Sequence, residues 1–113
     1  MVMDTNKQIK LNEQLVKAAR SGDLEELKRL YKHGADITAQ NNLAIVLAAK
    51  NGHMNIVKWL HEHGADITAQ DNWAIIFSLG NGHLNVSKWL HEHGADITAQ
   101  DNAAIVLAAI SPP

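Results

Sequence analysis

The sequence contains no cysteine, and its two prolines are the last two of its 113 residues. The absence of cysteine excludes disulfide bonds and thiol catalysis. The formal net charge is only −2 at pH 7, and the ten Lys and Arg residues are scattered along the chain. Because a nucleic-acid partner calls for a clustered basic face, we expect no nucleic-acid binding.

Long hydrophobic runs are also missing. The longest apolar stretches, residues 43–49 and 103–110, are far shorter than the roughly 20 residues that a membrane-spanning helix needs. The first ten residues are polar and lack the apolar core of a signal peptide. The sequence therefore predicts a soluble cytoplasmic protein without a membrane partner, long enough to bury the core of one domain.

A 12-residue segment is repeated three times: residues 31–42 read "YKHGADITAQNN", and residues 61–72 and 91–102 both read "HEHGADITAQDN". The period of 30 residues is in the range of repeat solenoids, and residues 43–72 match 73–102 at 21 of 30 positions. We predict a single repeat domain, 1–113, that comprises an N-terminal capping unit (1–42), two repeats (43–72 and 73–102) and a C-terminal half repeat (103–113).

Helix signals divide each repeat into two short helices. Asp71 and Asn72 supply oxygens that can cap a following helix, and the Asn-Gly pair at 51–52 can end one. A second helix is expected from Met54 to His63, with one apolar stripe, before Gly64 ends it. The β-branched stretch 43–49 also suits a buried strand, but caps on both sides favour a helix. We therefore predict an all-α fold.

The spacing Ala48-Ala49-x-x-Gly52-His53-x-x-Ile56-Val57-x-x-Leu60-x-x-x-Gly64-Ala65-Asp66-Ile67 resembles the ankyrin repeat, and the likeness extends over residues 13–110. It implies an ankyrin-type helical solenoid that binds a protein partner. The usual ankyrin repeat has about 33 residues and a Thr-Pro-Leu-His signature. Here the signature is absent and the finger loop is three residues shorter, as in arrays encoded by large DNA viruses. The lost Thr and His imply the loss of hydrogen bonds between neighbouring units.

The paired histidines do not form a metal site. His61 and His63 are two residues apart on a helix, which points them to different sides, whereas a helical zinc pair needs a spacing of three or four. We expect no metal and no cofactor, and interpret these histidines as cations at helix C-termini. By resemblance, His61 and His91 hold a packed position. A partly buried neutral imidazole there would lose stability on acidification, unless the ring reaches solvent.

Catalysis finds no support in the sequence. The stretch Gly80-Asn81-Gly82 lacks the third glycine and the preceding strand of a phosphate-binding loop. Asp36, Asp66 and Asp96 recur in a turn, where an aspartate usually bonds nearby backbone amides. We expect His53 and His83 to form hydrogen bonds between units, and we predict no enzymatic activity.

The differences between the two full repeats are the better guide to function. Six of the nine substitutions lie in residues 73–80, the first helix, which by resemblance lines the concave binding face. Large aromatic residues there suit a protein partner, although repacking is the alternative, since Leu79 adds volume and Ser87 removes it. The expected partner-binding residues are Leu43, Leu47, Trp73, Ile76 and Phe77. The alternative is an engineered or bare scaffold without a natural ligand, which fits the verbatim return of residues 58–72 at 88–102.

The end of the chain predicts self-association. Residues 103–110 carry no charge and form only the first helix of a unit, whereas solenoids usually end in a polar capping repeat. An exposed apolar helix marks an interface, and a two-fold dimer would close it. The residues expected in this homodimer contact are Val106, Leu107 and Ile110; the alternative is a last helix that frays.

Overall fold

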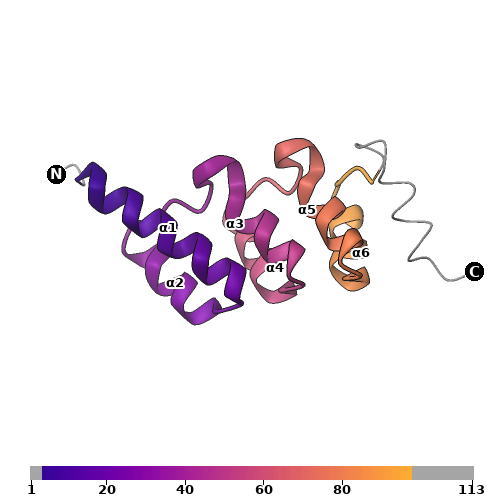
Figure 1. Ribbon diagram of the computed structural model, residues 1–113, viewed down its shortest axis with the longest axis horizontal. Helices are drawn as coiled ribbons and strands as arrows, with labels where there is room; N and C mark the ends of the chain where they lie inside the picture. The colour runs from indigo at the N-terminus through magenta and orange to yellow at the C-terminus, as the bar shows by residue number, and fades with distance from the viewer. Residues whose placement is uncertain (1–3, 98–113) are drawn as a thin grey trace, which may run out of the picture.

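The computed structural model describes residues 4–97, and these residues form six helices and no strand. The helices are α1 (Thr5–Ser21), α2 (Leu24–Lys32), α3 (Ala39–Lys50), α4 (Met54–Glu62), α5 (Ala69–Gly80) and α6 (Leu84–Glu92). They pack as three pairs, named units 1, 2 and 3 in chain order, which stack side by side into an elongated array of 56 × 24 × 19 Å (Figure 1). The prediction of an all-α repeat fold is confirmed.

The second helix of each unit is amphipathic and ends at a glycine, as predicted. In α4, Ile56, Val57 and Leu60 form the buried stripe, and none of them is exposed to solvent. Gly64 then adopts a left-handed conformation with a φ of 102°, which costs glycine little. The next amide, of Ala65, turns back and donates to the Leu60 carbonyl at 2.9 Å, which satisfies one of the open carbonyls of the helix end.

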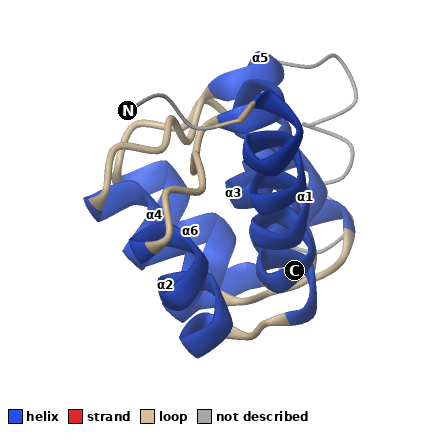
Figure 2. Cartoon of the chain, turned by 90° about the vertical axis from the view of Figure 1, so that its left-hand side faces the viewer, coloured by secondary structure: helices blue, strands red, loops and turns tan. Residues whose placement is uncertain are grey.

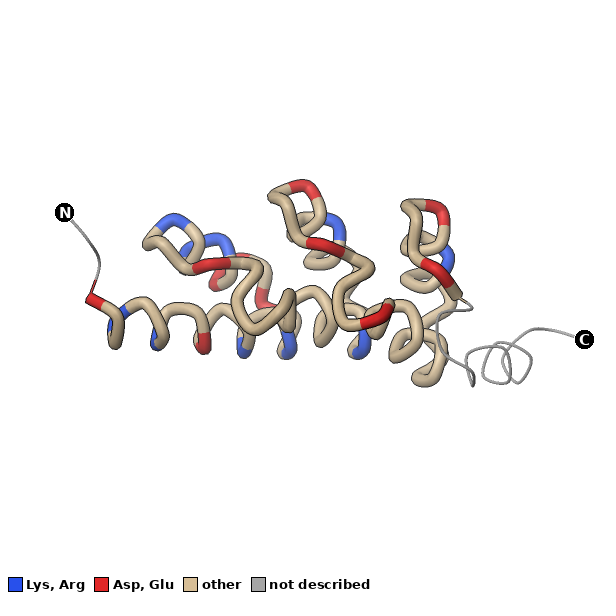
Figure 3. Tube along the Cα trace, turned by 90° about the horizontal axis from the view of Figure 1, so that it is seen from above, with Lys and Arg blue, Asp and Glu red and all other residues tan. Residues whose placement is uncertain are grey.

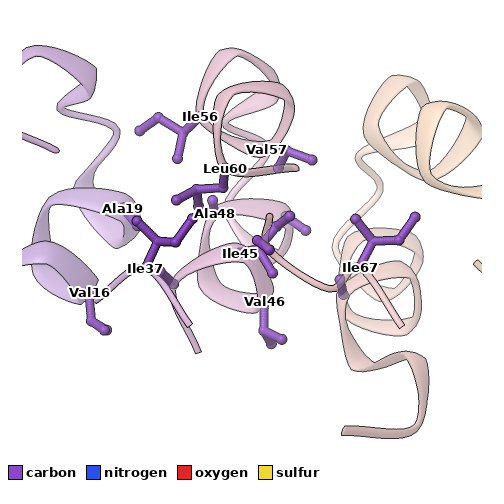
Figure 4. Packing of buried hydrophobic residues seen from close by; sticks show 14 of the residues in the cluster. Val16, Ala19, Ile37, Ile45, Val46, Ala48, Ile56, Val57, Leu60 and Ile67 are labelled. Atoms are coloured by element: carbon purple, nitrogen blue, oxygen red, sulfur yellow. The ribbon is translucent and has the colours of Figure 1, made fainter. Parts of the chain in front are cut away.

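The first helices line up on one side of the array and the second helices on the other (Figure 2). Ala48 and Ala49 are completely buried, and such small side chains let α1, α3 and α5 pack directly against one another. The second helices make fewer contacts between units, so the array is more tightly spaced along its first helices. Ile37 and Ile67, from the connectors before α3 and α5, are buried in the core shared by neighbouring units (Figure 4). The helix prediction for residues 43–49 is confirmed.

The start of each later first helix differs from the prediction. Residues 40–42 and 70–72 all have φ between 55° and 64°, so each forms a short left-handed turn before the right-handed helix begins. The predicted helix cap from Asn72 is wrong, because its side-chain oxygen accepts from the backbone amide of Asp96, in the connector after unit 3.

Asn72 and its counterparts form a regular set of hydrogen bonds between each first helix and the connector after the same helix pair. The side-chain oxygens of Asn12, Asn42 and Asn72 accept from the backbone amides of Asp36, Asp66 and Asp96, at 2.8, 2.9 and 2.8 Å. Each bond joins a first helix to the connector that lies 24 residues later. These bonds tie each connector to the first helix of the pair before it. Bonds between units, present even though the Thr and His of the usual ankyrin signature are absent, join the other ends of the first helices.

A second set of bonds ties the other ends of the first helices together. The side-chain amides of Asn51 and Asn81 donate to the carbonyls of Arg20 and Lys50, at 3.1 and 2.9 Å. The His53 ring nitrogen Nε2 also bonds the Arg20 carbonyl, at 3.0 Å. The prediction that His53 forms a hydrogen bond between units is confirmed.

Unit 3 contains a buried polar pair that has no counterpart in unit 2. The hydroxyls of Ser78 on α5 and Ser87 on α6 lie 2.7 Å apart, and both side chains are buried. Unit 2 has Ala48 and Val57 at these positions. The presence of each serine therefore accounts for the presence of the other, because one buried hydroxyl supplies a hydrogen-bond partner for the other.

Candidate partner-binding face

Each first helix leaves one stripe of side chains outside the core. Residues separated by four and then three positions lie on the same side of a helix, and in α3 these are Leu43, Leu47 and Lys50. The 30-residue period places the corresponding residues of α1 and α5 in parallel stripes. We call this surface the first-helix face; it comprises Glu13, Lys17, Arg20, Leu43, Leu47, Lys50, Trp73, Phe77 and Gly80.

Aromatic side chains gather at the unit 3 end of this face. The rings of Trp73 and Phe77 are in contact, with centroids 4.4 Å apart and a tilt of 34°. The ammonium nitrogen of Lys50, from unit 2, lies 5.2 Å from the Phe77 ring centroid. This is within the distance at which a cation is attracted to an aromatic ring. The three side chains thus form one patch that spans two units.

The structure places four of the five predicted partner-binding residues on the first-helix face. Leu43, Leu47, Trp73 and Phe77 are each half-buried, so each rests on the core and still presents part of its surface to solvent. Ile76 differs, because only 7% of it is exposed and it belongs to the core beneath the face. Their role in binding remains a prediction.

A ladder of rings runs along the opposite side, over the second helices. Trp59 stacks on His63 with ring centroids 3.8 Å apart, and His63 Nδ1 bonds the Trp59 carbonyl at 2.7 Å. Tyr31 of unit 1 meets the edge of Trp59 at 5.2 Å. Trp59 and Trp89 are half-buried and pack against the core. The ring ladder was not predicted, although the spacing of four residues between Trp59 and His63 is a signal for it.

The same arrangement repeats one unit further on. His61 meets the edge of Trp89 at 5.3 Å and the ring of His93 at 5.6 Å. His61 is half-buried, and its Nδ1 atom is buried without a hydrogen-bond partner among the described residues, whereas His91 is exposed. Within residues 4–97, no three His, Asp or Glu side chains come close enough to bind one metal ion.

The aspartates of the connectors bond locally. The backbone amide and hydroxyl of Thr68 both donate to Asp66 Oδ1, at 2.8 and 2.6 Å, and Thr38 does the same for Asp36. These bonds stabilise the carboxylate and hold the pKa of Asp66 below its ordinary value. The interpretation of these two aspartates as turn residues is confirmed.

Three stacked helix pairs with a shared core and an exposed stripe on each first helix define a helical repeat protein. The family model that describes ankyrin repeats in three copies matches residues 15–101. The chain belongs to the ankyrin repeat family, whose members are generally protein-interaction modules without catalytic activity. A comparison with curated proteins finds no significant match. No helix in the described part of the chain is long and apolar enough to cross a membrane.

Proposed function

We propose that this protein binds a protein partner, without catalysis, through the first-helix face. The contact centres on Trp73 and Phe77, with Leu43 and Leu47 beside them and Ile76 supporting the surface from below. Partly exposed aromatic side chains fixed on rigid helices are typical anchors of protein interfaces, because they contribute a large contact area at a small entropy cost.

One observation carries this proposal. At the two face positions where unit 2 has leucines, unit 3 has Trp73 and Phe77, whose ring centroids are 4.4 Å apart and whose side chains are half-buried. Repacking accounts for the buried substitutions, since Ser78 and Ser87 are bonded to each other and Leu79 is in the core. It does not account for larger side chains on a surface that faces solvent.

The experiment is affinity capture with matched surface variants. Three proteins are immobilised and exposed to a lysate of the source cells: the wild type, the Trp73→Ala/Phe77→Ala double variant and a Leu84→Ser control. Leu84 is 48% exposed on α6, so its replacement removes an apolar side chain outside the first-helix face. We expect a partner that the wild type and the control retain and the double variant loses. A partner retained equally by all three contradicts the proposal.

The alternative is a repeat scaffold without a natural ligand, engineered or recently duplicated. The exact repetition of residues 58–72 at 88–102 favours it. Such a scaffold would retain nothing that depends on Trp73 and Phe77. The same capture experiment therefore separates the two functions.

We also propose that this protein is cytoplasmic and that it forms a homodimer through Val106, Leu107 and Ile110. These residues lie outside the described range, and the proposal rests on the uncharged composition of residues 103–110. Light scattering coupled to size exclusion tests it. We expect twice the chain mass, returning to the monomer mass in Leu107→Lys. A mass near 12.4 kDa at high micromolar concentration contradicts the homodimer. A fluorescent fusion protein, imaged in cells, tests the cytoplasmic location.

A further inference from the structure

We propose that the first-helix face binds a partner segment in which apolar side chains are followed by acidic side chains. The apolar side chains contact Trp73 and Phe77, and the acidic ones lie over Lys50, Arg20 and Lys17. This inference rests on the proposed function, because it specifies the chemistry and the orientation of the partner on the same face.

The face changes in character along the array. At its unit 3 end it has the two aromatic rings and no basic residue, since α5 contains neither Lys nor Arg. Unit 2 contributes two leucines and Lys50, and unit 1 contributes Glu13, Lys17 and Arg20. Figure 3 shows the basic residues of the first helices gathered along α1 and at the end of α3. The surface therefore runs from apolar to basic within a single row of helices.

The position of Lys50 fixes how the basic residues relate to the aromatic patch. Its ammonium group lies over Phe77 of the next unit at 5.2 Å. Arg20 occupies the equivalent position in unit 1, 30 residues before Lys50. The carbonyls of both residues are bonded by Asn81 and Asn51 of the following unit, so both helix ends are held in place. The two cations continue the line of the apolar residues along the face.

These cations are not neutralised within the described chain. Between residues 4 and 97, the ion pairs are those of Lys28 with Glu25 and Arg29 with Glu26, and all four residues are on α2. Lys17 and Arg20 are exposed, and Lys50 is half-buried beside an aromatic ring. A carboxylate of a partner is the group that complements such a row, and charges of this kind set the orientation and specificity of binding more than its strength.

The distances between units give the segment an approximate length. Neighbouring packed helices are about 8–10 Å apart, so Lys50 and Arg20 lie roughly one and two helix spacings from the α5 stripe. A helical partner rises about 1.5 Å per residue, so the acidic position over Arg20 would follow the apolar anchors by roughly 12 residues. The position over Lys50 would follow them by fewer than roughly 6, because the Lys50 ammonium reaches Phe77. A segment of about 20 residues covers the whole face.

Panning of a displayed library of random 20-residue peptides tests the inference. The wild-type protein is the bait, and the selected peptides are then measured against three variants. The first is Trp73→Ala/Phe77→Ala. The second, Lys17→Glu/Arg20→Glu/Lys50→Glu, reverses the charges of the face. The third, Lys32→Glu/Lys58→Glu/Lys88→Glu, is its matched control, because it makes the same change in net charge at exposed lysines of the second helices.

We expect selected peptides with an aromatic or aliphatic cluster at one end and Asp or Glu toward the other. Charge reversal on the face should weaken their binding by about tenfold or more at low salt, and the second-helix control by less than about twofold. Peptides that need Trp73 and Phe77 but show no acidic preference and no effect of face reversal overturn this inference alone. Peptides that bind the aromatic double variant as well as the wild type overturn the proposed function too.

Discussion

The buried serine pair of unit 3 gives a sharp test of how the repeats pack. In the part of the chain that the structure describes, Ser78 and Ser87 are the buried polar residues, with 0% and 4% exposed. Their oxygens are 2.7 Å apart, and each also lies 2.9 Å from a backbone carbonyl, of Ile75 and His83 respectively. Two hydroxyl protons thus serve three contacts, so at most two of the three are hydrogen bonds at one time, and the contact between the two serines is the one that they share.

The double variant Ser78→Ala/Ser87→Val restores the residues of unit 2, and we expect it to be more stable than the wild type. Replacing both hydroxyls together leaves no buried hydroxyl unpaired, and valine adds one heavy atom of apolar volume worth about 0.8 kcal/mol. Each single variant loses the shared bond, which is worth about 1 kcal/mol. The single and double changes should therefore differ from additivity by the value of that bond, about 1 kcal/mol.

Urea unfolding of the wild type, both single variants and the double variant measures this coupling. The reverse exchange in unit 2 is the control, since Ala48→Ser with Val57→Ser should cost less than the sum of the two single changes. A double variant less stable than the wild type would refute the reasoning, and so would a coupling within about 0.3 kcal/mol of zero. Either result would mean that the serines do not stabilise one another in the folded state.

Three further predictions concern the turns and helix ends. Gly52 and Gly82 have φ of 77° and 76°, but a Cβ on Gly52 would lie 2.6 Å from the ring of His83, whereas one on Gly82 meets none of the residues 4–97 within 4 Å. Gly52→Ala should therefore lower the melting temperature more than Gly82→Ala, whose cost is left-handed strain of about 1–2 kcal/mol; equal losses would contradict this. A Cβ on Gly80 meets no atom of the described residues within 4 Å, so Gly80→Ala should stabilise by about 0.5–1 kcal/mol. It should also raise the amide-exchange protection of unit 3, which we expect to be the weakest unit. Because the pKa of Asp66 is lowered, its contribution to stability is present at neutral pH and lost as the pH falls below its ordinary value, so Asp66→Asn should flatten the acid limb of a melting curve.

The 30-residue period made most of the fold predictable. Gly64 and its neighbours end the second helix where the sequence indicated, and Ile56, Val57 and Leu60 form the expected stripe. These features depend on local rules, namely the tolerance of glycine for positive φ and the spacing of apolar residues on a helix. Repetition strengthens such rules, because each unit has to satisfy them against its neighbours.

The first-helix starts could not be predicted from local rules. Asn72 is a good helix cap by residue type, yet its oxygen accepts from the amide of Asp96 at 2.8 Å, in the next connector. A contact with a residue 24 positions away decides between the two uses of the side chain. The sequence did contain a signal for the use of Asn72 as a contact between segments. Unit 1, whose sequence matches the other units only loosely, also has an asparagine at this position, Asn12.

The candidate site was predictable only in part. The half-buried state of Trp73 and Phe77 follows from helix periodicity, but their contact with Lys50 across a unit boundary does not. Ile76 was counted with the surface residues because it too differs between the repeats, and the structure shows it in the core. Sequence differences identify which helix has changed; the burial of each side chain follows from packing between units.

The left-handed turns explain why the sequence of the repeated 12-residue segment varies so little between units. Each turn holds three successive non-glycine residues at positive φ, a conformation that costs about 1 kcal/mol per residue, less for asparagine. The cost is offset by bonds between turns and from turns to connectors, such as Gln70 Nε2 to the Asn41 carbonyl at 3.0 Å and Asn42 to the amide of Asp66. A substitution in one turn therefore weakens its neighbour as well. The stripe residues of the first helices are not constrained by bonds between turns, so unit 3 can have Trp73 and Phe77 where unit 2 has Leu43 and Leu47 while the turns stay the same. Three of the nine differences between the two repeats, at positions 73, 77 and 80, thus lie on the face that we propose for partner binding.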